Sequence, residues 1–228
     1  MKIMKMNNIV PACAFGLCVL FASGCARDRF LNADQTAVVT PQPPPILATP
    51  AVFLLTNNAG FLANVRIEEQ RGASSGRLYG SGAQLFYAPD EKNHATKHGP
   101  SGGFSFIWDA AKNSGIVICE ALQGYAPISH SGNGSITNVT VEPGLVTATL
   151  RDGSQIKFQS ASKTGKAGIP ERVTGGTPAF NAVFEKVQSE VPPPEVFKVP
   201  DGLTAYKSME AMVDEMAFRY RNLKRRTD

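Results

Sequence analysis

Residues 61–68 read Phe-Leu-Ala-Asn-Val-Arg-Ile-Glu, and this stretch decides the fold. Its odd-numbered positions, Phe61, Ala63, Val65 and Ile67, are all apolar, whereas three of its four even-numbered positions are polar. An alternation with a period of two is typical of a β-strand that has one face covered by other residues. We therefore expect that this strand belongs to a sheet with one buried face.

Seven further stretches have the length and composition of short strands. They are residues 77–79, 84–88, 104–109, 115–121, 136–141, 145–150 and 155–159. Glu-Pro-Gly at 142–144 and Arg-Asp-Gly-Ser at 151–154 are turn signals between neighbouring strands, which makes antiparallel hairpins the expected connection. The pattern predicts one meandering antiparallel sheet.

The rest of the chain adds one ambiguous segment and two helices. Residues 180–188 fit a helix by one spacing of their apolar residues and a strand by another. We favour a strand because Pro178 and the Val-Pro-Pro-Pro at 191–194 limit this segment to a short length. A short helix is expected over residues 51–57, after Thr49-Pro50. A longer one is expected near the C-terminus, capped by Ser208 and carrying an ion pair between Glu215 and Arg219. Its apolar stripe consists of Met209, Met212, Val213, Met216, Tyr220 and Leu223.

The predicted fold class is therefore α+β: a mainly antiparallel, curved, half-barrel-like sheet with a short N-terminal helix and a C-terminal amphipathic helix. The Lys and Arg residues at the end of the chain form a basic tail. Their positive charges interact favourably with the negative end of that helix's dipole.

The start of the chain has the plan of a secretory signal peptide. Lys2 and Lys5 supply positive charge, residues 9–21 form an uncharged and mostly apolar run, and Ala-Ser-Gly at 22–24 precedes Cys25. This ending resembles the lipobox of bacterial lipoproteins, and the resemblance implies that Cys25 is acylated and becomes the first residue of the mature chain. The apolar run is shorter than the about 20 residues of a membrane-spanning helix, which favours a cleaved signal.

The same resemblance implies a location. Two or more acyl chains hold a protein firmly on a bilayer. In many Gram-negative bacteria an aspartate directly after the lipidated cysteine favours the inner membrane, but this chain has Ala26. We therefore expect the periplasmic face of the outer membrane, with the inner membrane as the alternative.

Removing residues 1–24 takes away Lys2 and Lys5 and no acidic residue, so 204 of the 228 residues remain and the formal net charge falls from +4 to +2. A charge this small gives no electrostatic case for a nucleic-acid partner. The expected organisation is a signal peptide at 1–24, a lipidated cysteine with a Pro/Thr-rich tether at 25–49, a curved-sheet domain at 50–206 and a helix with a basic tail at 207–228. Prolines at 41 and 43–45 make the tether extended and semi-rigid.

Several short motifs resemble the Lol-type periplasmic lipoprotein carriers. They are Gly-Arg-Leu at 76–78, Leu-Phe at 85–86, Pro89, Phe-Ile-Trp-Asp at 106–109, Gly-Ile-Pro at 168–170, and residues 183–187 and 196–202. The resemblance implies a strongly curved antiparallel sheet whose hollow is filled by helices. Where the carriers have an arginine that helps hold a lid shut, this chain has Gly82, so the resemblance does not extend to gated transfer of lipoproteins.

An apolar face with several aromatic side chains is the best candidate for binding. Residues on the strands at 61–68 and 104–109 could share the concave face of one sheet, where they would either pack on helices or line a pocket. The loop at 122–128 either meets a ligand or partner at the rim or folds down as a plug. The predicted ligand-binding residues are Phe61, Val65, Phe104, Phe106, Trp108, Leu122 and Tyr125.

No catalytic set, metal site or cofactor is expected. His94 and His98 have the i, i+4 spacing of metal ligands on a helix, but Asn93, Gly99 and Pro100 indicate a loop. Cys119 follows three β-branched residues, which favours a buried thiol with a raised pKa and no role as a nucleophile. His130 lies in a Ser/Gly loop with no residue nearby to orient it. Asp109 ends a strand at a turn.

The sequence thus predicts a noncatalytic, membrane-anchored periplasmic lipoprotein that binds an apolar ligand or a lipid-bearing partner in the concavity of its sheet. The alternative is a structural or assembly lipoprotein of the envelope that binds another protein through residues 122–128. An enzyme would require one of the three histidines to converge on Asp109 or Glu120.

Lipidation at Cys25 is directly testable. Labelling with radioactive palmitate is expected in the wild-type chain and absent in Cys25→Ala, because the thioether and the amide of the acyl chains both require that residue. The matched control, Cys119→Ala, should keep the label. Label retained in Cys25→Ala would contradict the prediction.

Overall fold

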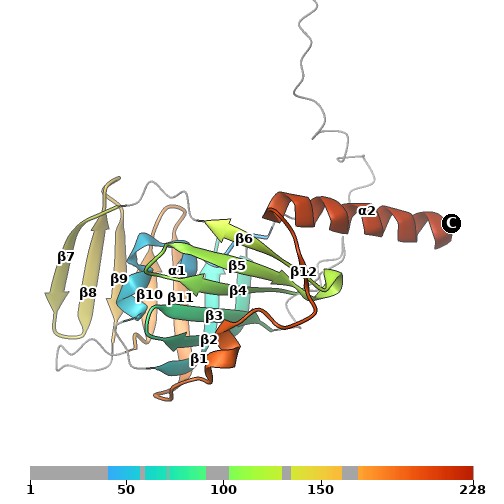
Figure 1. The fold of residues 1–228 in the computed structure, drawn as a ribbon. Coiled ribbons are helices and arrows are strands. Elements are labelled where there is room, and N and C mark those ends of the chain that lie inside the picture. The colour runs from blue at the N-terminus through green and yellow to red at the C-terminus, as the bar shows by residue number, and fades with distance from the viewer. Residues whose placement is uncertain are drawn as a thin grey trace, which may run out of the picture. The chain divides into compact units, whose positions relative to one another are not determined.

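The computed structural model describes residues 41–56, 60–70, 72–90, 103–129, 135–160 and 169–227. The predicted signal peptide, Cys25 and all three histidines, His94, His98 and His130, lie outside these residues. In the described part of the chain, twelve strands form one sheet, accompanied by helices α1 and α2 and by short 3₁₀ helices (Figure 1).

The sheet consists of two antiparallel meanders. The first contains β1 (Phe61–Glu69), β2 (Gly72–Ser81), β3 (Gln84–Pro89), β4 (Phe104–Asp109), β5 (Ser114–Cys119) and β6 (Gly124–Ser129). The second contains β7 (Ile136–Glu142), β8 (Leu145–Leu150), β9 (Gln155–Gln159), β10 (Arg172–Gly175) and β11 (Phe180–Gln188). The strand order is β12-β6-β5-β4-β3-β2-β1-β11-β10-β9-β8-β7, with the short β12 (Thr204–Ala205) parallel to β6.

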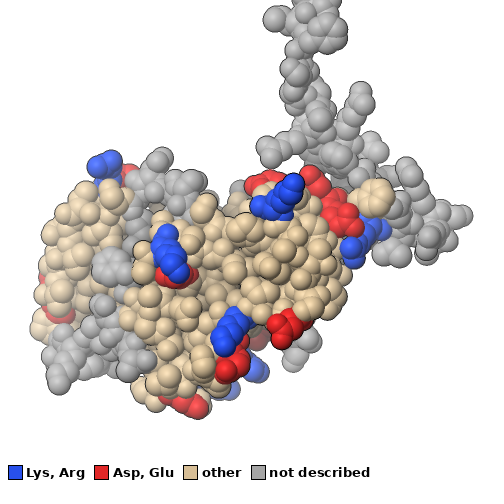
Figure 2. Space-filling view, in the orientation of Figure 1, with Lys and Arg blue, Asp and Glu red and all other residues tan. Residues whose placement is uncertain are grey.

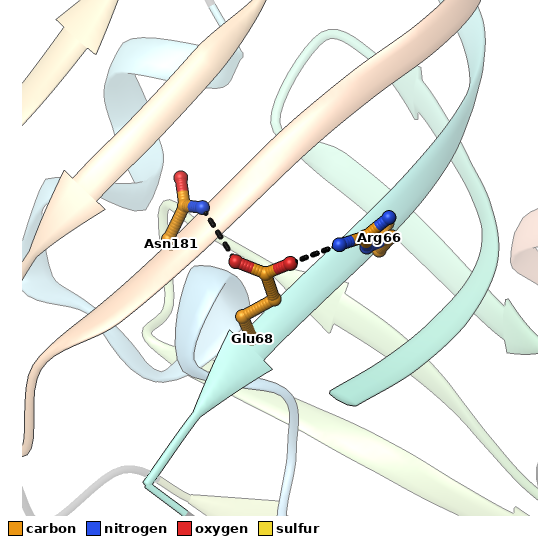
Figure 3. Close-up of polar contacts among 3 residues, drawn as sticks. All are labelled: Arg66, Glu68 and Asn181. Atoms are coloured by element: carbon orange, nitrogen blue, oxygen red, sulfur yellow. Dashed lines mark hydrogen bonds and ion pairs between the residues drawn. The ribbon is translucent and has the colours of Figure 1, made fainter. Parts of the chain in front are cut away.

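Pairing of β1 with β11 joins the two meanders. Val65 lies opposite Phe184, and Ile67 lies opposite Ala182; all four side chains are buried. On the opposite face of the same strands, Glu68 accepts a hydrogen bond of 2.9 Å from Nδ2 of Asn181 and pairs with Arg66 (Figure 3). The hydrogen bond from Arg66, followed by that from Asn181, lowers the pKa of Glu68. The junction is thus held on both faces.

The connection between the meanders requires the sheet to curl. Strands β6 and β7 are ten places apart in the strand order, which in a flat sheet would separate them by about 48 Å. The chain between Ser129 and Ile136 makes seven Cα-to-Cα steps and can span at most about 25 Å. The two ends of the sheet must therefore approach each other, and the inner face becomes concave.

A segment near the start of the described chain fills the hollow. Helix α1 (Pro45–Ala48) begins where the carbonyl of Pro44 accepts hydrogen bonds from the amides of Leu47 and Ala48, and the 3₁₀ helix η2 (Pro50–Leu55) follows. Ile46, Leu47 and Leu55 are fully buried and belong to the same apolar cluster as the inner face of the sheet. Figure 1 shows this blue segment against the strands, where it covers apolar surface that would otherwise face water.

This arrangement confirms the predicted fold class of a curved, mainly antiparallel sheet with an N-terminal and a C-terminal helix. The strands over Phe104–Asp109, Leu145–Leu150, Gln155–Gln159 and Phe180–Gln188 have the predicted bounds. Three strands were not predicted: β6, which was expected as a loop, and the short β10 and β12. The strand expected to end at residue 121 ends at Cys119, where the 3₁₀ helix η4 (Glu120–Leu122) begins.

The folded body begins earlier than the predicted boundary at residue 50. Residues 41–49 were expected to belong to the tether, yet Ile46, Leu47 and Thr49 are buried in the body. The prolines were interpreted as marks of an extended spacer, but Pro45 occupies the first position of a helix, where a missing N–H costs nothing. The helix predicted over 51–57 is the 3₁₀ helix η2, which ends at Leu55.

Helix α2 (Met209–Thr227) confirms the predicted C-terminal helix. The hydroxyl of Ser208 accepts a hydrogen bond from the amide of Ala211, and Glu215 pairs with Arg219 at 2.7 Å. Met212 and Met216 are buried and join the core cluster, and the helix packs beside β6. None of the described helices is long and apolar enough to cross a membrane.

The outer face is less covered than the inner one. The 3₁₀ helix η5 (Pro194–Phe197) contacts β3, and its Phe197 is buried outside the main core cluster. Strand β7 is an edge of the sheet and exposes Val139 and Val141. On the face in Figure 2, charged side chains lie singly or beside a charge of opposite sign, separated by uncharged surface.

Close contact between Phe61 and Gly80 generates a stability prediction. The two residues lie opposite each other on β1 and β2, and a Cβ atom at Gly80 would overlap the Phe61 ring. Gly80→Ala is therefore expected to destabilise the fold by about 1–3 kcal/mol through overpacking, measured by urea unfolding. Arg77→Ala, on an exposed position of the same strand, should change stability by less than about 0.5 kcal/mol. Equal stability of the two variants would contradict the packing described.

Candidate functional site

A cavity of about 560 Å³ lies between the inner face of the sheet and the segment that fills its hollow. Side chains from β3, β4, β8 and β9 line it together, although β4 and β9 are six places apart in the strand order. Only the curl of the sheet can bring them to one site. The volume lies within the roughly 300–1,000 Å³ of typical small-molecule sites.

Most of the cavity wall is apolar. Phe104 and Phe106 contribute to it from β4, Leu150 and Ile156 from β8 and β9, and Phe180 from the start of β11. Phe106, Leu150, Ile156 and Phe180 are buried, and Phe104 is partly buried. Binding of an apolar molecule against such a wall is favourable by about 25 cal/mol for each Å² of apolar surface removed from water.

Proline residues form the wall opposite the sheet. Pro41, Pro43, Pro44 and Pro45 line the cavity, and Ala48 and Thr49 continue the wall along α1. Proline rings fix the backbone φ angle and leave no N–H at these positions. This wall is therefore stiff and offers few hydrogen-bond donors to a ligand.

A small polar group lies on the inner face where β1, β2 and β3 adjoin. Glu69 shares a face with Phe61, Ala63, Val65 and Ile67 because successive side chains of a strand alternate. By the same alternation Ser74 shares a face with Leu78, and Tyr87 with Leu85. All three polar residues line the cavity.

The hydroxyl of Tyr87 is buried without a partner. The residue is 3 % exposed, and its Oη has no hydrogen bond within the described residues. Burial raises the pKa of Tyr87 to about 12; Ser74 approaches closely enough to oppose this in part, but without the geometry of a hydrogen bond. The tip of the ring lies over Gly76, where a Cβ atom would be 2.7 Å from Cζ and 2.8 Å from Oη. Only glycine leaves room for this ring position.

Acidic residues are the charged part of the described cavity wall. Glu69 lies at the end of β1, and Asp152 lies in the turn between β8 and β9. Asp152 accepts hydrogen bonds from the hydroxyl of Ser154 at 2.7 Å and from its amide at 2.9 Å, and these contacts lower its pKa. No Lys, Arg or His is among the described residues that line the cavity.

The structure places the predicted ligand-binding residues in two groups. Phe104 and Phe106 line the cavity. Phe61, Val65 and Trp108 lie on the same inner face and in the same cluster, but they are packed into the core with 1 % exposure each and do not line the cavity. The prediction of a shared face is confirmed. For these three residues, ligand contact stays a prediction, and the structure shows them buried in the core.

Neither Leu122 nor Tyr125 lines the cavity, and neither lies in a loop at its rim. Leu122 ends η4 and is buried, and Ala126 and Ile128 of β6 are buried beside it, so the predicted rim folds down onto the core. Tyr125 points to the other side of β6 and is half-buried, with its carbonyl accepting a hydrogen bond from the amide of Tyr206. The Gly-Tyr-Ala-Pro sequence at 124–127 suggested a loop because proline is rare inside strands.

Sequence reasoning missed the polar cavity residues and the proline wall. The alternation that identified Phe61 to Ile67 as inward-facing extends by one more step to Glu69, which was a usable signal. The inward direction of Tyr87 follows from its place two residues after Leu85. The role of the prolines had no local signal, because it depends on a fold that brings them over the sheet.

Cys119 and Asp109, two of the residues weighed for catalysis, lie within the described part of the chain, and the three histidines do not. Cys119 is buried, and loss of hydration raises the pKa of its thiol, as predicted. Asp109 accepts hydrogen bonds from the amides of Ala111 and Lys112 and pairs with Lys112 at 2.8 Å, which closes the turn between β4 and β5. Across the described ranges, no three His, Cys, Asp or Glu side chains gather as metal ligands.

Comparison with known proteins provides no family. No family model and no curated protein matches the chain. Among solved structures, PNGF-II in its C2 crystal form has a TM-score of 0.41 and 7% identity over 71% of this chain and 33% of that chain. Its P2₁ form has a TM-score of 0.43 and 6% identity over 72% and 34%. The chain thus spans about a third of PNGF-II, and similarity at this level carries no argument about activity.

The unpartnered hydroxyl makes Tyr87→Phe a favourable change. Removing a buried polar group that has no partner should leave the free energy of unfolding at neutral pH unchanged or raise it by about 1–2 kcal/mol. Since the pKa of Tyr87 is higher in the folded state than in the unfolded chain, wild-type stability is complete below about pH 10 and falls as the pH rises toward 12.

Chemical unfolding at about pH 8 and about pH 11 would measure both effects. At about pH 11 the wild type should have lost roughly 1 kcal/mol more than Tyr87→Phe. Tyr79→Phe is the matched control, because Tyr79 lies on the other face of β2 against Phe86. A Tyr87→Phe variant that is clearly less stable than the wild type at pH 8 would mean that the hydroxyl has a partner.

Proposed function

We propose that this chain is a noncatalytic lipoprotein, anchored to a bacterial membrane through Cys25, that binds an apolar molecule in the cavity of its curved sheet. The cavity carries the proposal. A wall made mostly of aromatic, aliphatic and proline side chains lines about 560 Å³ of space.

The position of the proline wall supports a link between anchor and cavity. Residues 41–45 line the cavity, and only fifteen residues separate Pro41 from Cys25. The anchor would hold the cavity within a few nanometres of the lipid surface, since a proline-rich segment extends by about 3.1 Å per residue. An apolar molecule leaving a bilayer, or the lipid of another protein, would meet the site there. The resemblance to the Lol-type carriers and the outer-membrane location stay proposals.

Binding of 1,6-diphenylhexatriene, a hydrocarbon whose fluorescence rises in apolar surroundings, would test the cavity. The full chain, freed of detergent, is expected to bind it saturably. Ala48→Phe places a ring in the cavity from α1. The loss of about 60 Å² of buried ligand surface corresponds to roughly 1.5 kcal/mol, and the affinity should fall about tenfold.

Ala73→Phe is the matched control, because Ala73 is exposed on β2 and does not line the cavity. It adds the same ring elsewhere and should bind the dye like the wild type. Since all three proteins carry the same anchor, a difference between them reports on the cavity and not on the acyl chains. Equal binding by wild type and Ala48→Phe would reject the cavity as the site.

A further inference from the structure

Helix α2 carries an exposed aromatic ring on the side turned away from the core. Phe218 is 54 % exposed, and among the described side chains it is the only aromatic one in the exposed class. Met212 and Met216 hold the helix on the core. At about 100° per residue, Phe218 lies about 140° around the helix from their mean direction. The ring therefore leaves apolar surface in water.

The same side of the helix carries arginines beyond Phe218. Arg221 and Arg225 follow it at i+3 and i+7, so helical spacing places them on one face with it. In the first half of the helix this face carries Glu210 and Asp214. The charge along the face thus changes from negative to positive at Phe218.

The helix dipole does not account for all of this positive charge. Residues 219–226 contain five Lys or Arg and no acidic residue. The dipole acts on charges within the last turn, which covers residues 224–227. Arg219 pairs with Glu215. Arg221 lies more than one turn from the end of the helix, so the dipole gives no reason for an arginine there.

The end of α2 extends away from the sheet. The helix packs beside β6, and Figure 1 shows the C-terminal half of the red helix lying beyond the described strands. A basic helix with an exposed aromatic ring has the composition of segments that lie among the head groups of an anionic membrane. Charge complementarity therefore favours an anionic lipid surface as the partner of this face.

The proposed anchor would bring such a surface within reach. Sixteen Cα-to-Cα steps separate Cys25 from Pro41, a span of at most about 55 Å. A link of this length does not by itself determine which side of the body faces the bilayer. A second contact on the body would determine it.

We propose that the C-terminal half of α2 is a second membrane contact, in which Arg221 and Arg225 bind anionic lipid head groups and the Phe218 ring enters the interfacial layer. The inference goes beyond the cavity and rests on the anchoring part of the proposed function. Since the acyl chains already attach the protein firmly, the contact sets the orientation of the body and adds little to total binding.

Fluorescence of Phe218→Trp in the full lipidated chain tests this proposal. The native Trp108 is 1 % exposed and gives a constant background. The protein would be placed on vesicles of phosphatidylcholine alone or of phosphatidylcholine and phosphatidylglycerol in equal parts. At low salt, acrylamide is expected to quench the introduced ring at least about threefold less on the anionic vesicles. About 0.5 M NaCl should abolish the difference.

Removal of two charges from the helix is compared with removal of two charges from the sheet. Arg221→Gln with Arg225→Gln should lower the ratio of surface-bound to free helix about thirtyfold, because each cation near an anionic surface contributes roughly a factor of five. Quenching should then equal that on the neutral vesicles. Arg77→Gln with Lys157→Gln removes the same charge from exposed strand positions and should keep the protection.

Two results would overturn the surface contact. One is equal quenching on both kinds of vesicle, and the other is an equal loss of protection in the two double variants.

Failure of the proposed function has different signs. A chain that does not float with phosphatidylcholine vesicles lacks the anchor, and a chain that does not bind diphenylhexatriene lacks the binding cavity. A chain that floats and binds the dye, but is quenched equally on both vesicles, keeps the proposed function and lacks the contact through α2.

Discussion

Antiparallel pairing of β1 with β11 is the constraint on which the structure depends. Each strand has nine residues, and their pairing unites two meanders that would otherwise be separate sheets. The inner face of the pair buries Val65, Ile67, Ala182 and Phe184, and the Glu68–Asn181 contact crosses the outer face. Without this junction, residues of β4 and β9 would have no reason to face one space. The cavity is thus a product of long-range pairing, and no single segment contains it.

The sequence predicted the local elements well wherever the residue pattern had a single interpretation. Four strands have the predicted bounds, and the alternation from Phe61 to Ile67 identified the buried face. The segment over Phe180–Gln188 was ambiguous by period, and the flanking prolines favoured the correct strand. Errors occurred where tertiary context outweighs local signals. Pro127 argued against a strand, yet β6 pairs with β5 on one side and with only two residues of β12 on the other.

The candidate site was predictable in part. Phe104 and Phe106 were expected to face a concavity, and they line the cavity. Phe61 and Trp108 satisfied the same pattern and became core, because a sequence shows which face is buried but not which part of that face is left uncovered. The proline segment was the largest error of interpretation, because its composition alone indicated a spacer. Ile46 and Leu47, which follow the prolines, are buried in the core and hold the segment inside the hollow of the sheet.

The short link between β6 and β7 has an effect beyond chain connectivity. It limits how far the two margins of the sheet can separate, and therefore how wide the space between them can become. The volume enclosed by the sheet is then limited by the number of residues in that link as well as by the side chains inside. Lengthening that link therefore offers a way to enlarge the interior without altering a strand.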